Sequence, residues 1–236
     1  MTSRTSHVAR RTSQVTAVLL AASVLSAHDL ITSPVTWNSD VARIVEARCV
    51  RCHSAGGRGP MPLTTYAEAR PWARAIKEEV LTRRMPKWHA ARGYGAFAND
   101  PSLSSFEIAL IAAWADGGAP RGNDPAKRPA EATQPATQSA PGERQIQVLC
   151  RNQRLPEGSL LAVRPQLASG RSIGLAVRQP DRSTEVVAWV RDYNPKFPET
   201  YRLRTPIRLT RNSQLIVQTD DTTGSCRLSL TVAPLR

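Results

Sequence analysis

The residues of this chain best suited to chemistry are Cys49, Cys52 and His53, which follow one another in the order C-x-x-C-H. This pattern is the attachment signal of c-type haem. Two thiols three positions apart can reach both vinyl groups along one haem edge, and the adjacent imidazole is then held under the iron as an axial ligand. One motif therefore predicts one covalently attached haem.

Two other kinds of site use closely spaced cysteines. A thioredoxin-like redox pair is expected beside a βαβ pattern, whereas the residues flanking this motif are helical in character. A structural zinc site needs a second pair of ligands, and the other cysteines, Cys150 and Cys226, lie far along the chain. The haem interpretation is the one that the flanking sequence favours.

The second axial ligand is expected from the few soft or basic side chains that remain. Met85 lies 32 residues after His53, and Pro86 keeps it out of a helix. A thioether opposite an imidazole suits iron and raises the reduction potential. His89 is the competing ligand, an open position is a further alternative, and Met61 is expected to pack against the haem edge.

Other residues are expected to support this site. A ligating histidine usually donates its second ring nitrogen to a backbone carbonyl, and the loop containing Gly57, Gly59 and Pro60 could bring one close to His53. A haem in a small domain also needs bulky apolar neighbours. The candidates, which could equally be ordinary core residues, are Trp37, Trp72, Trp88 and Trp114.

The elements that must position these residues form a helical half, residues 28–118. Apolar side chains recur there at helical spacing behind recognisable start signals. These signals are Ser39 before a first helix, Thr65 with Glu68 before a short turn to Arg70, Pro71 before a helix running to about Arg83, and Ser104 with Glu107 before a helix that stops at Gly117.

The second half, residues 143–236, changes to short runs rich in β-branched residues, separated by Gly, Pro, Asn and Asp. The runs are 145–150, 160–165, 173–177, 185–190, 201–209, 215–219 and 227–232. Seven such runs predict an antiparallel β-sandwich. The Pro- and Ala-rich segment 119–142 predicts an extended linker, so the fold class is multi-domain, all-α followed by β.

The first 27 residues predict an export signal. Basic residues precede an apolar stretch from Val15 to Ala27, which is shorter than the roughly 20 residues of a membrane-spanning helix. An uncleaved signal anchor is the alternative, and no other membrane span is expected. Export places the mature protein in the periplasm or another oxidising compartment, where Cys150 and Cys226 are expected to form a disulfide rather than remain free thiols.

Charge gives weaker guidance. The chain has 32 Lys and Arg against 19 Asp and Glu, a formal net charge of +13. Such an excess favours encounters with acidic partners. No nucleic-acid motif and no basic run interleaved with aromatic residues accompanies it, so nucleic acid is not expected as a partner.

Residues 33–122 resemble a class I c-type cytochrome domain of exported bacterial proteins. The resemblance implies an electron carrier with Met85 as distal ligand. The stretches that carry it are Thr36-Trp37-Asn38, Ala47–His53, Gly59–Leu63, Ala69–Ala73, Arg84–Trp88 and Trp114–Pro120.

Residues 155–220 faintly resemble the C-terminal domain of copper type II ascorbate-dependent monooxygenases. In that domain a His-Met-His-like turn holds copper, but here the turn reads Gln166-Leu167-Ala168, and residues 143–236 contain neither His nor Met. The resemblance therefore implies a degenerate domain with no copper, which serves as a binding or a structural module.

The expected function is transfer of single electrons to and from redox partner proteins through a haem held by Cys49, Cys52, His53 and Met85. Catalysis is not expected. Two alternatives remain open: a haem-containing subunit of a peroxidase- or oxygenase-type enzyme, and a haem sensor or partner-binding module. Binding of carbon monoxide to the reduced protein separates the first alternative from electron transfer.

Overall fold

A computed structural model of the chain describes residues 35–123, 142–222 and 224–235. The expected export signal and most of the expected linker, residues 124–141, lie outside these ranges. The described residues from Val35 onward belong to one compact unit. No helix among them is both long enough and apolar enough to cross a membrane.

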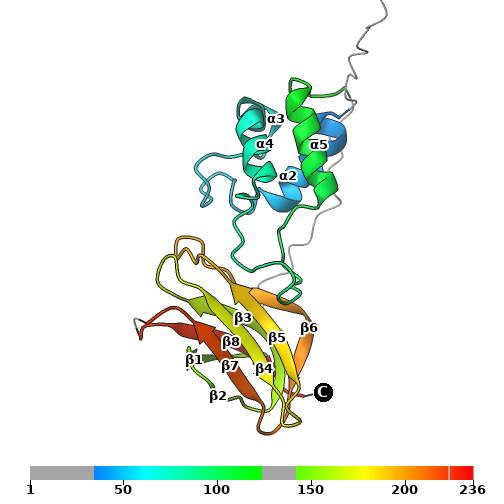
Figure 1. The fold of residues 1–236 in the computed structure, drawn as a ribbon. Coiled ribbons are helices and arrows are strands. Elements are labelled where there is room, and N and C mark those ends of the chain that lie inside the picture. Colours follow the sequence, from blue (N-terminus) through cyan, green and yellow to red (C-terminus); the bar gives the residue numbers. More distant parts are fainter. Residues whose placement is uncertain (1–34, 124–141, 223, 236) are drawn as a thin grey trace, which may run out of the picture. The chain divides into compact units, whose positions relative to one another are not determined.

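The first half is helical (Figure 1). The elements are η1 (Trp37–Val41), α2 (Ala42–Arg48), α3 (Tyr66–Ala69), η2 (Arg70–Trp72), α4 (Ala73–Leu81) and α5 (Ser105–Asp116). Both expected capping boxes are present: Thr65 with Glu68 before α3, and Ser104 with Glu107 before α5. The first helix begins earlier than expected, because Thr36 rather than Ser39 supplies the capping oxygen.

The helices share one apolar core, to which every longer helix contributes a buried face. Val41, Ile111 and Trp114 are fully enclosed in it. The indole nitrogen of Trp114 donates to the carbonyl of Pro120, 3.0 Å away, and the amide of Trp37 donates to the same carbonyl. The start of the Pro-rich segment is therefore bound to the helical core.

The second half forms two four-stranded antiparallel sheets, as expected for a β-sandwich (Figure 1). Their strand orders are β1-β8-β3-β6 and β2-β7-β4-β5. The strands are β1 (Arg144–Leu149), β2 (Gln153–Arg154), β3 (Gly158–Gln166), β4 (Ile173–Arg178), β5 (Thr184–Val190), β6 (Tyr201–Leu209), β7 (Gln214–Thr219) and β8 (Arg227–Ala233). The two-residue β2 is the one strand that the sequence did not predict.

The predicted disulfide is confirmed. Cys150 and Cys226 are bonded, with their Cα atoms 5.5 Å apart. They lie directly beyond the paired residues Leu149 and Arg227, so the bond closes the end of the β1–β8 ladder. Buried alternating residues from both sheets then fill the space between them, as in other two-sheet folds.

A segment from the helical half also packs on the sandwich. Ala90 forms an isolated β-bridge with Val190 of β5, and Phe97 forms one with Leu203 of β6. Both β5 and β6 are edge strands of their sheets. The segment 88–99, which follows Met85 closely in sequence, is therefore bound to the edges of both sheets.

Candidate functional site

The C-x-x-C-H motif occupies a single tight turn at the end of α2. The Cys49 amide donates to the carbonyl of Val45, which ends the helix. The amides of Cys52 and His53 then both donate to the carbonyl of Cys49, at 3.0 and 2.9 Å. The turn gathers both thiols and the imidazole within one short stretch of backbone, and both cysteines are free thiols.

The imidazole of His53 is oriented by the loop that follows it. Its Nδ1 lies 3.0 Å from the carbonyl oxygen of Met61, and the Leu63 amide donates to the carbonyl of His53 at 2.9 Å. With Nδ1 donating to Met61, the tautomer leaves the lone pair of Nε2 free. This is the expected support for a metal-ligating histidine, with the carbonyl supplied by Met61, directly after Pro60.

Two glycines allow this loop to approach the motif. The Gly59 amide donates to the Cys52 carbonyl at 2.8 Å. A Cβ on Gly59 would lie 2.6 Å from Nδ1 of His53, and one on Gly57 would lie 2.3 Å from the Cys52 carbonyl oxygen. Any side chain at these positions would displace the imidazole or the turn.

The electrostatics of the cysteines bear on the alternative of a redox-active pair. Burial, reinforced by the neighbouring Cys52, raises the pKa of Cys49 to about 12. A nucleophilic cysteine of a redox motif instead needs a lowered pKa. Cys49 is a protonated thiol at neutral pH, which disfavours the thioredoxin-like interpretation.

Within the described ranges, no group of three or more His, Cys, Asp or Glu side chains is arranged to hold a metal ion. The motif offers two free thiols and one imidazole nitrogen. These residues fit a haem, whose porphyrin supplies the other four nitrogens.

Met85 lies just beyond α4. The amides of Arg84 and Met85 both donate to the carbonyl of Glu79, at 2.9 and 3.2 Å. The side chain of Met85 is half-buried and belongs to neither of the two apolar cores of the described chain. Met61, in contrast, packs against the helical core.

His89, the competing ligand, is held by the sandwich. Its carbonyl accepts from the Arg191 amide at 2.9 Å, and its ring lies 5.9 Å from that of Tyr193. Burial lowers the pKa of His89, so the ring is neutral at pH 7. Its Nε2 is buried without a hydrogen-bond partner among the residues the structure describes.

The four tryptophans proposed as haem neighbours are not brought together. Trp37 and Trp114 pack against each other in the helical core, with ring centroids 5.6 Å apart and planes tilted by 45°. Trp72 is 44% exposed. Trp88 lies against the sandwich core, 4.8 Å from the ring of Tyr201.

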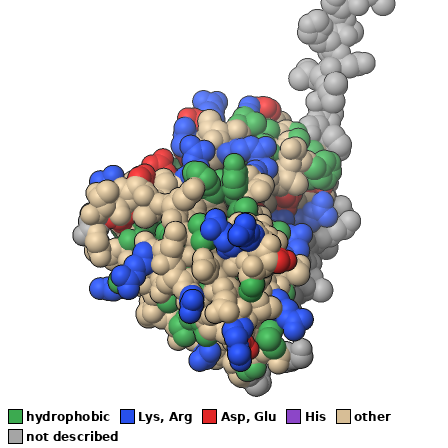
Figure 2. All heavy atoms as spheres, turned by 60° about the horizontal axis from the view of Figure 1, so that its bottom comes forward, with side chains coloured by type: hydrophobic (Ala, Val, Ile, Leu, Met, Phe, Trp, Pro, Cys, Tyr) green, Lys and Arg blue, Asp and Glu red, His purple; other side chains and the backbone are tan. Residues whose placement is uncertain are grey.

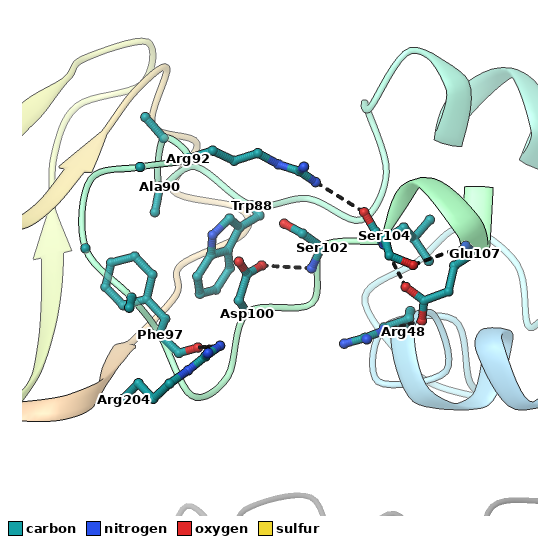
Figure 3. A pocket seen from close by; sticks show the side chains of 15 residues that line it. Arg48, Trp88, Ala90, Arg92, Phe97, Asp100, Ser102, Ser104, Glu107 and Arg204 are labelled. Carbon is teal, nitrogen blue, oxygen red and sulfur yellow. Dashed lines mark hydrogen bonds and ion pairs between the residues drawn. The ribbon is translucent and has the colours of Figure 1, made fainter. Parts of the chain in front are cut away.

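Arg48, the residue directly before Cys49, lines a pocket of about 400 Å³ (Figure 3). Arg48 is paired there with Glu107 at 3.1 Å. Trp88 and Phe97 face the pocket from the segment held by the sandwich. The pocket is therefore walled by aromatic rings and charged side chains, without a thiol, thioether or imidazole.

One contact at the motif was not predicted. Arg51, between the two cysteines, pairs with Glu199, whose carboxylate oxygen lies 2.5 Å away, and Arg58 reaches the same oxygen at 3.4 Å. The side chain of Glu199 is only 9% exposed. The partners are 148 residues apart, and no local pattern in the sequence marks Glu199.

Comparison with known proteins adds little. No family model matches the chain, and no curated protein matches it. A solved structure of a pentameric capsid protein isolated from metagenomic phage sequences, solved by iodide SAD phasing, is 15% identical, with a TM-score of 0.27 over 39% of this chain and 68% of that one. Another structure of a pentameric capsid protein from metagenomic phage sequences is 17% identical, with a TM-score of 0.28 over 68% of this chain and 89% of that one. Likenesses this weak carry no argument about this chain.

Proposed function

We propose that this protein is an exported monohaem c-type cytochrome that carries single electrons between redox partner proteins. In this proposal Cys49 and Cys52 attach the haem, and His53 and Met85 ligate its iron. Residues 28–118 then form a small all-α cytochrome c domain, and residues 143–236 form a module without copper. The bound haem would supply one-electron Fe(III)/Fe(II) chemistry.

The observation that supports this proposal most is the state of His53. Its Nδ1 donates to the Met61 carbonyl, which fixes the ring plane and leaves the lone pair of Nε2 free to ligate a metal. Two free thiols lie on the same turn. A backbone-oriented imidazole beside two unpaired thiols is the arrangement that covalent attachment and axial ligation both need.

The chain's own residues would then carry out two tasks. Cys49 and Cys52 anchor one edge of the group to the turn after α2. The loop containing Gly59 would hold the imidazole of His53 against rotation. Arg48 and Arg51 are each paired with a carboxylate, Glu107 and Glu199, so the charges beside the motif are balanced.

Expression of the full chain with export and haem maturation tests the proposal. We expect a coloured protein whose pigment stays with the polypeptide in acidified acetone. The C49S/C52S double variant, exported in the same way, should lose the covalent pigment. A wild-type protein that is colourless, or whose pigment is extracted, overturns the proposal.

Spectroscopy of the same sample tests ligation. We expect a near-infrared sulfur-to-iron band in the oxidised protein and its loss in M85A. The reduced wild-type protein should not bind carbon monoxide. Rapid and complete carbon monoxide binding would instead support the enzyme alternative, which requires an open coordination position.

A further inference from the structure

The start of β6 contacts both segments that carry the proposed axial ligands. Glu199 and Tyr201 lie two positions apart, at the point where the chain enters that strand. Glu199 reaches the C-x-x-C-H motif, and Tyr201 reaches the segment just after Met85. The two central side chains, Glu199 and Tyr201, are themselves buried.

The first connection is an ion pair centred on a buried carboxylate. Glu199 accepts from Arg51 within the motif and from Arg58 in the loop that orients His53. A carboxylate this buried is strongly destabilised without a partner. Glu199 therefore ties both segments to the sandwich, and it is the one acidic side chain that pairs with either arginine among the described ion pairs.

The second connection is a cluster of aromatic rings that meet edge to face. The ring of Trp88 lies 4.8 Å from that of Tyr201 and 5.7 Å from that of Phe97, in edge-to-face geometry. The backbone beyond it is fixed as well, because the Ala91 amide donates to the carbonyl of Trp189 at 2.7 Å. Residues 88–99 therefore pack on the sandwich.

Met85 therefore lies between two fixed positions, its own amide bonded to Glu79 and the ring of Trp88 packed on the sandwich. On one side its amide is bonded to the Glu79 carbonyl, and Arg84 pairs with Glu79. On the other side, Trp88 is inserted against the sandwich core. Only Pro86 and Lys87 separate Met85 from that second position, and so short a span limits how far the thioether can move.

We propose that the start of β6 is a clamp that keeps the proposed haem site six-coordinate, with Tyr201 holding the Met85 segment through Trp88 and Glu199 holding the attachment motif through Arg51. This inference rests on the proposed function. Tyr201 and Glu199 act through Trp88 and Arg51, so they are positioning residues. Any event that loosens β6 is then expected to release the Met85 side and open the iron to external ligands.

A haem-independent experiment tests the clamp. Trypsin can cut after Arg84 and Lys87, the bonds that flank residues 85–87. In the chain prepared without haem, we expect W88A to be cut at these bonds faster than wild type, and W88F to be cut at the wild-type rate. Equal cleavage of W88A and wild type overturns the clamp on the Met85 side.

The haem-loaded full chain supplies the second test. W88A should retain covalent haem but show a weakened near-infrared sulfur-to-iron band, a lowered reduction potential and carbon monoxide binding. E199Q should retain covalent haem and show the same weakened band and carbon monoxide binding. The conservative W88F should restore the wild-type spectrum. E185Q removes one negative charge from an exposed position on β5 and is the matched control for E199Q, with an unchanged spectrum expected.

The outcomes separate the two proposals. Covalent haem with wild-type bands and no carbon monoxide binding in both W88A and E199Q overturns the clamp and leaves the proposed function intact. A wild-type chain that carries no covalent haem overturns both. If W88A does not fold, E199Q against E185Q still tests the half of the clamp that Glu199 forms with Arg51, and a wild-type spectrum in E199Q overturns that half.

Discussion

At the scale of single residues, the imidazole of His53 is placed by backbone and not by other side chains. The Met61 carbonyl fixes its Nδ1, and Gly59 lies so close that a hydrogen is all that fits. The orientation of the His53 ring therefore depends on the absence of a side chain at residue 59. A loop glycine that could be taken for part of a flexible turn thus belongs to the site.

The variant G59A tests this dependence. The new Cβ would lie 2.6 Å from Nδ1 of His53, so the ring or the loop must shift. We expect a loss of roughly 1–3 kcal/mol in unfolding free energy, typical of overpacking, measured by denaturant titration. G174A is the control, because a Cβ there meets its nearest neighbour at 3.5 Å, an ordinary contact. Equal losses in both variants would contradict the argument.

At the scale of elements, the capping box that starts α5 also supplies a contact to α2. Its capping box joins Ser104 to Glu107, and the same carboxylate pairs with Arg48 at the end of α2. Although burial raises the pKa of Glu107, the bonds from Ser104 and the charge of Arg48 lower it overall, below the usual 4.5. The ionised form is therefore favoured in the folded state.

This shift predicts a dependence of stability on pH. A carboxyl whose pKa is lowered by folding contributes stability above its unfolded pKa of 4.5, and that contribution is lost as the pH falls through the lower folded value. We expect the unfolding free energy to fall below about pH 4.5 less steeply in E107Q than in wild type. E185Q, at an exposed position on β5, serves as the control and should keep the wild-type slope.

The cap itself can be tested at neutral pH. S104A removes the oxygen that accepts from the Glu107 amide and should lower the unfolding free energy by about 1 kcal/mol. Thermal or denaturant unfolding followed by circular dichroism measures the loss. A variant as stable as wild type would show that the helix end is satisfied by other groups.

The disulfide acts on the β1–β8 ladder. Cys150 and Cys226 close a loop of 76 residues, for which the chain-entropy model gives about 4 kcal/mol. We expect the C150S/C226S variant to be less stable by that order in denaturant unfolding. A loss well under 1 kcal/mol would mean that the unfolded chain is already restricted without the bond.

Both the helices and the strands were predictable where their signals are local. Capping boxes at Thr65 and Ser104 depend on residues three positions apart, and the strands have alternating burial along their own length. The strand β2 was missed because two residues are too few to show a period. The start of η1 was misplaced by choosing Ser39, although Thr36 supplies the capping oxygen.

The candidate site was predictable only in part, for the same physical reason. The turn geometry of Cys49–His53 and its supporting carbonyl are local. The contact from Glu199 to Arg51 spans 148 residues and depends on tertiary packing alone. Trp88 was a candidate for the haem pocket because it is a bulky apolar residue, or else an ordinary core residue, and in the structure it packs on Tyr201 and Phe97 of the sandwich core.

At the scale of the whole molecule, the charge is positive and widely spread. The face shown in Figure 2 carries Lys and Arg side chains scattered across it, with few acidic groups among them. With a net charge of +13, the long-range field steers acidic partners toward the molecule without choosing one docking patch.

This distribution predicts a salt effect on rate. If the proposed function holds, electron exchange with an acidic redox protein should slow markedly as ionic strength rises, because the field is screened within about 8–10 Å at physiological salt. Exchange with an uncharged small reductant should be nearly constant and is the control. Stopped-flow kinetics measures both, and a salt-independent rate with the acidic partner would contradict steering.

The bridges made by Ala90 and Phe97 have one more consequence. Strand edges with unpaired amides and carbonyls can add strands from other molecules, which leads to aggregation. On this side of the sandwich, residues 90–98 supply hydrogen bonds to β5 and β6 from within the same chain. The connection that leads away from Met85 thus also covers these strand edges against self-association, and a proteolytic nick within it should make the protein polymerise edge to edge.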